Sequence, residues 1–175
     1  MPVLVSFTGL PGVGKSTIAR QLAKETGALW LWVDEIEAAM TSSEMEIQSM
    51  EDGGYAAARA MAKRALLQGF DVIADCVNPI ELARDAWDEV ATEAKAEHHT
   101  VAIHCSDEAK HKHRVDTRVV DLEGWQPPTW EQVSKRKMTP FDSEMISLDT
   151  SELSVTNAVA KLRVLFKSRE LGGNR

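Results

Sequence analysis

One segment near the start of the chain has residue types and a spacing that suit the binding of a phosphate chain. Residues 9–17 read GLPGVGKST and match the pattern G-x-x-x-x-G-K-[ST]. The glycines allow consecutive backbone N–H groups to turn inward around phosphate oxygens, and a helix that starts near Lys15 adds the positive end of its dipole. Lys15 brings a point charge to the β- and γ-phosphates, and the Ser16 hydroxyl can bind Mg²⁺. We expect nucleotide phosphates to contact Gly9, Pro11, Gly12, Val13, Gly14, Lys15, Ser16 and Thr17.

Two aspartates stand at the ends of apolar runs that predict strands. Asp75 ends the run FDVIAD, where a carboxylate holds Mg²⁺ directly or through a water, and we assign it to the metal site with Ser16. Asp34 follows the run 28–33 and is a candidate catalytic residue, because its carboxylate can accept the proton of an acceptor hydroxyl. Both aspartates have an alternative role as helix caps. Glu37, one turn further on, is read as a solvated helix residue.

A basic segment later in the chain provides further positive charge. Residues 110–118 read KHKHRVDTR, the only dense basic stretch in an acidic sequence. Arg114 and Arg118 are one helical turn apart, so they share a face of the predicted helix. Because a stretch with Gly and Pro follows at 121–140, the segment suits a mobile lid that brings both arginines onto transferring phosphates, with Arg118 as a catalytic residue. The alternative is a charged helix face that is simply solvated.

Apolar runs and helix-like patterns alternate along the chain. Short apolar runs rich in β-forming residues predict strands at 3–8, 28–33, 70–74, 100–105 and 145–148. Apolar residues at helical spacing predict helices at 15–25, 34–40, 55–67, 80–94, 107–120, 130–137 and 155–166, with a loop or insertion at 41–53. Strands that are each followed by a helix form a doubly wound parallel sheet of the α/β class. Ligands of such sheets bind beyond the carboxyl ends of the strands, which is where the residues above stand.

Length and composition limit the remaining possibilities. With 175 residues, 43% of them hydrophobic and 27% charged, the chain fits a single globular domain over residues 1–175, with the lid at about 107–140. The formal net charge of −7 argues against a protein that coats nucleic acid or anionic lipid, and we expect this surplus on the outer surface. No apolar stretch near the start is long enough for a membrane span. Cys76 and Cys105 form no CxxC pair and fit a reduced cytoplasm.

Six segments spread over nearly the whole chain match one family. They are GLPGVGKST, the run ending VDEI, VIADCVNP, RVDTR, PPTWEQV and ISLDTSEL. In these segments the sequence resembles P-loop kinases similar to nucleoside monophosphate kinases, in the group often labelled "AAA domain" small kinases. Gluconate kinases, chloramphenicol phosphotransferase, adenylylsulfate kinases and polynucleotide kinase domains are relatives. The resemblance implies a three-layer P-loop NTPase fold, with a five-stranded parallel sheet of order 2-3-1-4-5 flanked by helices and a lid segment.

The same resemblance implies roles for particular residues. ATP and Mg²⁺ would be the cofactors, and a hydroxyl or phosphate group would be the acceptor. Asp34 would be the acceptor-side carboxylate, Asp75 the Walker B residue, and Arg118, together with Arg114, the lid arginine. Residues 149–151 would border the adenine.

The resulting prediction is a kinase that moves the γ-phosphate of Mg-ATP to a small-molecule acceptor, as a cytoplasmic monomer or homodimer without membrane attachment. Two alternatives stay open: a nucleotide-binding regulatory module with slow ATP hydrolysis, and a 5′-hydroxyl polynucleotide kinase. An acceptor-side carboxylate followed by a basic lid favours transfer over a switch. Polynucleotide kinases of this group carry an arginine one turn after the strand-two aspartate, where Ala38 and Ala39 stand here. This departure disfavours nucleic acid as a partner.

Overall fold

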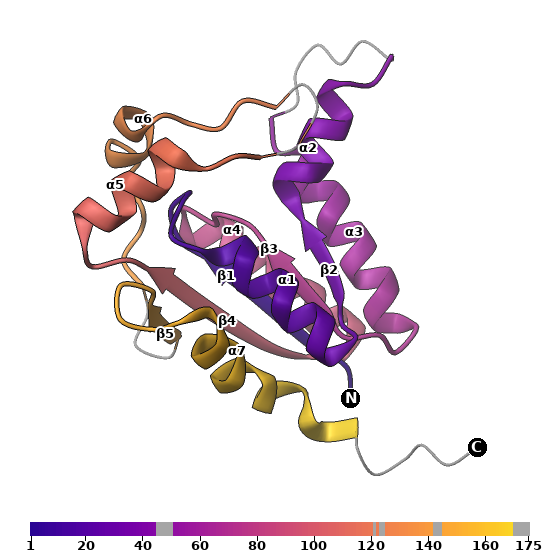
Figure 1. Cartoon of the computed structure of the whole chain (residues 1–175). Coiled ribbons are helices and arrows are strands. Elements are labelled where there is room, and N and C mark those ends of the chain that lie inside the picture. The colour runs from indigo at the N-terminus through magenta and orange to yellow at the C-terminus, as the bar shows by residue number, and fades with distance from the viewer. Residues whose placement is uncertain (45–50, 121, 123–124, 142–144, 170–175) are drawn as a thin grey trace.

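The centre of the molecule is a parallel sheet of five strands (Figure 1). The computed structural model describes residues 1–44, 51–120, 122, 125–141 and 145–169. In chain order the strands are β1 (Val3–Thr8), β2 (Leu29–Trp32), β3 (Val72–Asp75), β4 (Glu97–His104) and β5 (Ile146–Asp149). They lie side by side in the order β2-β3-β1-β4-β5, and all four neighbouring pairs are parallel. This order confirms the one that the resemblance implies.

The pairing of the strands brings the ends of β1, β2 and β3 to one edge of the sheet. β1 and β3 are buried along their whole length, as continuous apolar runs packed on both faces should be. The register pairs Trp32 with Asp75 and Ser6 with Ala74. The segments that leave these three strands therefore start close together, and they include the glycine-rich loop and Asp34.

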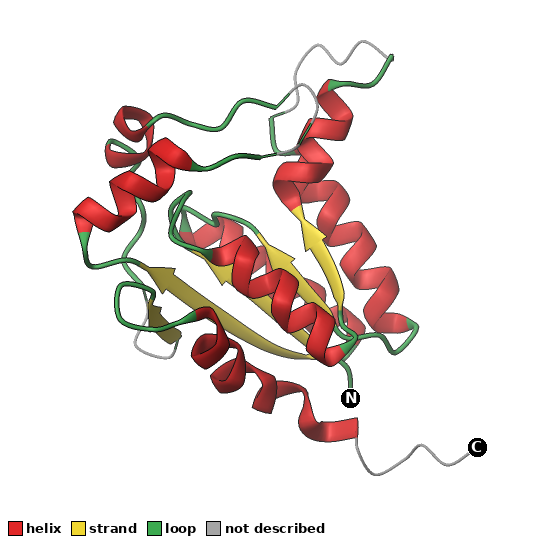
Figure 2. Cartoon of the chain, in the orientation of Figure 1, coloured by secondary structure: helices red, strands yellow, loops and turns green. Residues whose placement is uncertain are grey.

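Helices cover both faces of the sheet and make three layers (Figure 2). In chain order they are α1 (Lys15–Thr26), α2 (Val33–Thr41), α3 (Gly53–Leu67), α4 (Glu81–Ala94), α5 (Glu108–Thr117), α6 (Trp130–Ser134), α7 (Val155–Arg163) and the 3₁₀ helix η1 (Val164–Arg169). On one face, side chains of α1 and α7 pack with Val3, Val5 and Phe7 of β1. On the other face, α3 and α4 pack with Leu4. The side chains of β1 thus alternate between two apolar cores.

The lid, which we define as the described residues of 107–140 and which includes α5 and α6, lies on the side of the sheet to which the strands point (Figure 1). Thr129 and Gln132 form a reciprocal capping box that starts α6. The two helices meet where the ring of His111 contacts the ring of Trp130 edge-on, with centroids 5.1 Å apart. A hydrogen bond of 2.8 Å joins His111 Nε2 to the carbonyl oxygen of Pro11. The lid is therefore attached directly to the loop after β1.

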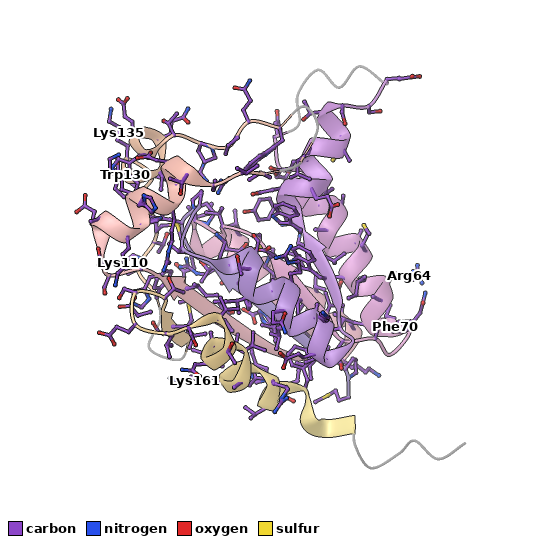
Figure 3. The ribbon with its side chains drawn as sticks, viewed as in Figure 1. Arg64, Phe70, Lys110, Trp130, Lys135 and Lys161 are labelled. Atoms are coloured by element: carbon purple, nitrogen blue, oxygen red, sulfur yellow. The ribbon has the colours of Figure 1, made fainter. Side chains whose placement is uncertain are left out.

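The lysines of the basic segment, Lys110 and Lys112, are exposed. Figure 3 shows Lys110 and Lys135 on the outer surface of the lid. Lys110 pairs with Asp107 at 3.4 Å and donates to the carbonyl oxygen of Ser151 at 3.4 Å, and Lys112 pairs with Asp116. Lys135, which follows the basic segment, pairs with Glu131 at 2.6 Å. The alternative of a solvated charged face is therefore correct for the lysines, and the arginines are treated below.

Several predicted elements are present with shifted ends. α5 ends at Thr117 rather than at residue 120, so Arg118 lies beyond the helix. β4 begins at Glu97 rather than at residue 100, because it pairs with β1 from Val3 onward. The last predicted helix is divided into α7 and η1. Tertiary pairing and packing decide such ends, and local propensity does not.

The predicted loop at 41–53 is shorter than expected. α2 extends through Thr41 and α3 begins at Gly53. Residues 45–50 of that loop, and residues 121, 123 and 124 of the predicted lid, lie outside the described residues. In the part of the chain that is described, none of the helices combines the length and apolar character needed to cross a membrane.

Candidate active site

The loop between β1 and α1 has a backbone that requires glycine. Gly12 and Gly14 have φ angles of 84° and 102°, in the left-handed region that side chains disfavour. A Cβ atom at Gly12 would lie 2.5 Å from Cγ2 of Val115 on α5, so the loop and the lid are in close contact. α1 starts at Lys15, and the first N–H groups of a helix have no partner within it. These N–H groups face the same loop, as a phosphate site needs.

A cavity of about 810 Å³ opens at this loop. Of the predicted phosphate contacts, its lining includes Pro11, Gly12, Gly14, Lys15, Ser16 and Thr17. Gly9 and Val13 are not part of the lining. The N–H of Gly9 donates to the carbonyl oxygen of Val77 at 3.1 Å, and the Val13 side chain is buried in the core. The other predicted site residues that line this cavity are Asp34, Asp75, Arg114 and Arg118.

Lys15 is buried at the start of α1, with 7% of its surface exposed. Its Nζ donates to the carbonyl oxygen of Leu10 at 3.0 Å. Burial lowers the pKa of Lys15, and the carboxylates of Asp75 and Asp34 raise it. The buried ammonium is thus hydrogen-bonded to a backbone carbonyl and lies in the field of two carboxylates, and a phosphate would meet a desolvated positive charge there.

Asp75 ends β3 and is 2% exposed. Its Oδ2 accepts a hydrogen bond of 3.3 Å from Nε1 of Trp30, whose ring stacks on that of Trp32 with centroids 5.6 Å apart. Burial raises the pKa of Asp75 to about 6, although Lys15 and the hydrogen-bonded Ser16 hydroxyl lower it. A hydroxyl and a carboxylate are oxygen ligands that fit Mg²⁺, which proteins hold through one or two carboxylates plus substrate phosphates. Among the described residues no cluster of three or more His, Cys, Asp or Glu could hold a metal ion, so phosphates would complete such a site.

Asp34 is the second residue of α2 and is half-buried. Trp32 occupies the N-cap position of α2, and Asp75 lies inside a strand, so neither aspartate caps a helix. The alternative role is therefore excluded for both. Asp34 is near enough to Lys15 and to Arg118 to raise the pKa of each. Its carboxylate therefore acts electrostatically on the ammonium of Lys15 and on the guanidinium of Arg118.

The two lid arginines reach the first cavity in different ways. Arg114 donates to the hydroxyl of Thr150 at 2.8 Å and to its carbonyl oxygen at 2.9 Å, which fixes the arginine to the loop after β5. Arg118 follows the end of α5, and its Cζ lies 5.0 Å from the ring centroid of Trp125. In the described part of the chain its buried Nε has no hydrogen-bond partner. The prediction that both arginines share one helix face is wrong, because α5 ends before Arg118.

A second cavity, of about 1010 Å³, lies on the other side of Asp34. Its walls come from α2, α3, α4, the loop before α4 and the lid. It shares Pro11, Asp34 and Val77 with the first cavity. Of the described residues, Asp34 is the one ionisable side chain that lines both spaces. The two cavities therefore meet at this carboxylate.

The sequence interpretation missed the residues that shape the second cavity. Glu37 is half-buried rather than solvated, and a Cβ atom at Gly54 of α3 would lie 2.3 Å from its Cγ. The hydroxyl oxygen of Tyr55 accepts a hydrogen bond of 3.2 Å from the backbone N–H of Asn78. These contacts join residues of α2, α3 and the loop after β3. A glycine beside another glycine at positions 53 and 54, at a predicted helix start, was the one local signal available.

The sheet order, the glycine-rich loop between β1 and α1, and the lid define a P-loop NTPase with a kinase-like, nucleotide-binding fold. The family model described as "AAA domain" matches residues 4–127, and the chain belongs to this family. No curated protein gives a significant match to the sequence.

Solved structures of three named proteins are similar over nearly the whole chain. The APS kinase CysC of Mycobacterium tuberculosis, in complex with AMPPNP and APS, has 16% identity and a TM-score of 0.72, and the match covers 95% of this chain and 98% of that one. Kti12 of Chaetomium thermophilum, in complex with ADP-AlF3, has 22% identity and a TM-score of 0.68, with 93% and 98% covered. A gluconokinase from Sinorhizobium meliloti 1021 has 18% identity and a TM-score of 0.60, with 94% and 91% covered. At these identities the similarity establishes the fold.

Proposed function

We propose that the protein is an ATP-dependent phosphotransferase that moves the γ-phosphate of Mg-ATP to a hydroxyl group of a small molecule. One observation carries this proposal: Asp34 lines both the cavity at the glycine-rich loop and the second cavity beside it. A protein that only hydrolyses ATP, or only switches with it, needs no space for an acceptor next to this carboxylate. We assign the first cavity to the nucleotide and the second to the acceptor.

The phosphates of ATP would lie against the glycine-rich loop. Backbone N–H groups from Gly12 to Thr17 and the Lys15 ammonium would hold the β- and γ-phosphates. Ser16 and Asp75 would hold Mg²⁺, which neutralises negative charge on the β- and γ-oxygens when it is bound. Arg114 would support the adenine side of the cavity, because it fixes the loop that contains Thr150, a residue of the cavity lining.

Phosphoryl transfer requires that a hydroxyl group of the acceptor lie beside the Asp34 carboxylate. As the hydroxyl oxygen forms a bond to the γ-phosphorus, its proton passes to the Asp34 carboxylate. The bond between the γ-phosphorus and the oxygen that bridges to the β-phosphate breaks, and ADP leaves with that oxygen and the electron pair. Arg118, whose Nε has no partner among the described groups, would stabilise the charge on the moving phosphoryl group. Positioning and electrostatics supply the rate in such a reaction.

The proposal includes a small molecule, and not nucleic acid, as the second partner. The net charge of −7 and the carboxylates of the second cavity both oppose a phosphodiester backbone. We further propose that the protein works in the cytoplasm as a monomer or homodimer. Light scattering coupled to gel filtration decides between these two states.

The experiment that tests the function follows the γ-phosphate. The protein is incubated with γ-labelled ATP, Mg²⁺ and a pool of hydroxyl-containing metabolites, and the products are separated. Label in a new organic phosphate supports the proposal, whereas label only in inorganic phosphate supports the regulatory module and overturns it. Labelled 5′-hydroxyl oligonucleotide would favour the polynucleotide kinase.

Two variants locate the activity in the proposed site. Lys15→Ala should lose most of the turnover and the nucleotide binding while the fold is retained. Asp34→Asn should lose transfer and keep ATP binding, since its carboxylate acts on the acceptor. Transfer at the wild-type rate by either variant would contradict the assignment.

A further inference from the structure

The charged side chains around the second cavity are mostly carboxylates. They comprise Asp34, Glu37, Glu51, Asp52, Asp85 and Glu89, against the two guanidinium groups of Arg59 and Arg136. Arg59 is already paired with Asp52 at 3.5 Å. Over the described ranges no salt bridge joins Asp34, Glu37, Asp85 or Glu89 to a cation. A cavity with this lining attracts cations and repels anions.

Glu37 is the carboxylate that the fold positions most closely. It follows Asp34 by three residues on α2, so both side chains lie on one face of the helix. Gly54, in the first turn of α3, leaves the room that Glu37 occupies, because a Cβ atom there would lie 2.3 Å from its Cγ and 2.8 Å from its Oε1. Burial and the neighbouring Asp34 raise the pKa of Glu37, and the nearest opposing charge is that of Arg136, which is exposed. A desolvated carboxylate is thus held beside the proposed catalytic residue with little compensation.

Aromatic side chains complete the same cavity. Tyr55 and Trp125 both line it. Burial raises the pKa of Tyr55, so the ring stays a neutral phenol. The Arg118 guanidinium already lies over the ring of Trp125, so Tyr55 is the aromatic side chain of this lining offered to an ammonium group. Carboxylates combined with an aromatic ring are groups that proteins use to bind an ammonium group.

We propose that the acceptor is an amino-substituted polyol, such as an amino sugar or an aminocyclitol, whose ammonium group binds Glu37 while its hydroxyl group faces Asp34. This inference rests on the proposed function and names the substrate class of the same site. Residues three apart on a helix have Cβ atoms about 5–6 Å apart. The ammonium and the reacting hydroxyl should therefore be separated by several bonds on a ring, and they should not be neighbours on a short chain.

The reaction keeps the ammonium group unchanged. The hydroxyl oxygen of the polyol forms the new bond to the γ-phosphorus of ATP, and the bond from that phosphorus to ADP breaks. The hydroxyl proton moves to Asp34 and then to solvent. Glu37 takes no proton and makes no covalent bond, so it is a specificity-determining residue.

The test compares polyol acceptors that carry a cationic, a neutral or an anionic group. Glucosamine and 2-deoxystreptamine are the amine probes, with glucose and N-acetylglucosamine as neutral controls and gluconate as the anionic control. Initial rates of ADP formation and of label transfer give kcat and KM for each compound. We expect kcat/KM for at least one amine probe to exceed that of every neutral and anionic control by tenfold or more. Equal or better transfer to glucose, N-acetylglucosamine or gluconate would overturn the inference and leave the kinase function intact.

Two variants test the role of Glu37, and a third variant is the matched control. Glu37→Gln should raise KM for the amine probe at least tenfold, with kcat and the KM for ATP little changed. Gly54→Ala removes no charge but displaces the Glu37 side chain, so it should raise the same KM. Glu93→Gln removes a carboxylate of α4 that pairs with Lys63 outside both cavities, and it should change neither constant.

Binding without turnover separates the two possible failures. 2-Deoxystreptamine alone should raise the Tm of the wild-type protein and leave that of Glu37→Gln unchanged. An equal rise in both proteins refutes the role of Glu37. If none of the five compounds accepts label while the metabolite pool does, the inference fails and the proposed function stands. If label appears only in inorganic phosphate with the pool as well, the proposed function fails, and the inference that rests on it fails too.

Discussion

Replacement of Asp75 by Asn should stabilise the protein in the absence of nucleotide and metal. Burial raises the pKa of Asp75 from 3.8 to about 6. Because one pKa unit corresponds to 1.36 kcal/mol, keeping this carboxylate ionised at neutral pH costs about 3 kcal/mol. Asparagine has nearly the shape of the protonated carboxyl and carries no charge to desolvate. The variant should therefore gain up to about 3 kcal/mol in free energy of unfolding at pH 7.5.

The gain in free energy of unfolding from Asp75→Asn should increase as the pH rises. Between about pH 4 and pH 6 the folded protein holds a proton on Asp75 that the unfolded chain has already released. The contribution of this group to stability is fully present below about pH 4 and is lost as the pH rises through about 6. The difference between Asp75→Asn and the wild type should thus be about 1 kcal/mol at about pH 4.5 and about 3 kcal/mol by about pH 7.5.

Urea unfolding at these two pH values, in EDTA and without nucleotide, measures the effect. The intrinsic fluorescence of the five tryptophans reports the transition, and midpoints are compared at a constant m-value. Asp85→Asn, at an exposed aspartate, is the control and should change stability by less than about 0.5 kcal/mol. A variant that is less stable than the wild type at pH 7.5, or a difference that is the same at both pH values, would refute the reasoning. Mg-ATP at 100 times its Kd should stabilise the wild type by about 2.7 kcal/mol and the variant by less.

Three further predictions concern the lid and the sheet. Gly12→Ala should lower stability by about 1–3 kcal/mol in urea unfolding, because it places a Cβ 2.5 Å from Val115 at a φ of 84°. Arg118→Ala should lower kcat at least tenfold with the Kd for ATP nearly unchanged, which rapid kinetics and equilibrium binding can separate. Burial lowers the pKa of His98 despite its bond to Asp88, so stability from this group is present above about pH 6.5 and is lost as the pH falls below it. His98→Gln should therefore flatten the decline in urea midpoint between about pH 7.5 and 5.5.

The fold could be predicted because its strongest signals are local. A strand buried on both faces, such as β1, must be a continuous apolar run, and an amphipathic helix such as α1 must repeat its apolar residues. The order of the strands was a different case. The sequence of a buried apolar strand does not indicate which other strands it pairs with. The strand order was therefore predicted from the resemblance to P-loop kinases and not from the residues themselves.

The candidate site divides in the same way. The glycine-rich loop is contiguous in sequence, so its spacing predicts its backbone. The contact of Gly12 with Val115, and that of Glu37 with Gly54, join separate elements, and no local pattern encodes them. α5 ends at Thr117, so Arg118 lies outside the helix. The spacing of residues along a helix does not indicate where the helix ends.

The distribution of charge agrees with the expectation that the surplus negative charge lies on the outer surface, because most of the described carboxylates are exposed. Glu51, Asp52, Asp85 and Glu89 are among these exposed groups and also border the second cavity. The second cavity has six carboxylates and two guanidinium groups in its lining. The first has the cations of Lys15, Arg20, Arg114 and Arg118 against the carboxylates of Asp34, Glu35 and Asp75. The phosphates of ATP would therefore bind in the first cavity, which contains these cations. Asp34 lies at the boundary between the two cavities. An acidic acceptor cavity beside a triphosphate is electrostatically unfavourable unless the acceptor itself brings positive charge. An amine-bearing acceptor would supply that charge at the boundary, and this is why the inference about the substrate follows from the same arrangement that supports phosphoryl transfer.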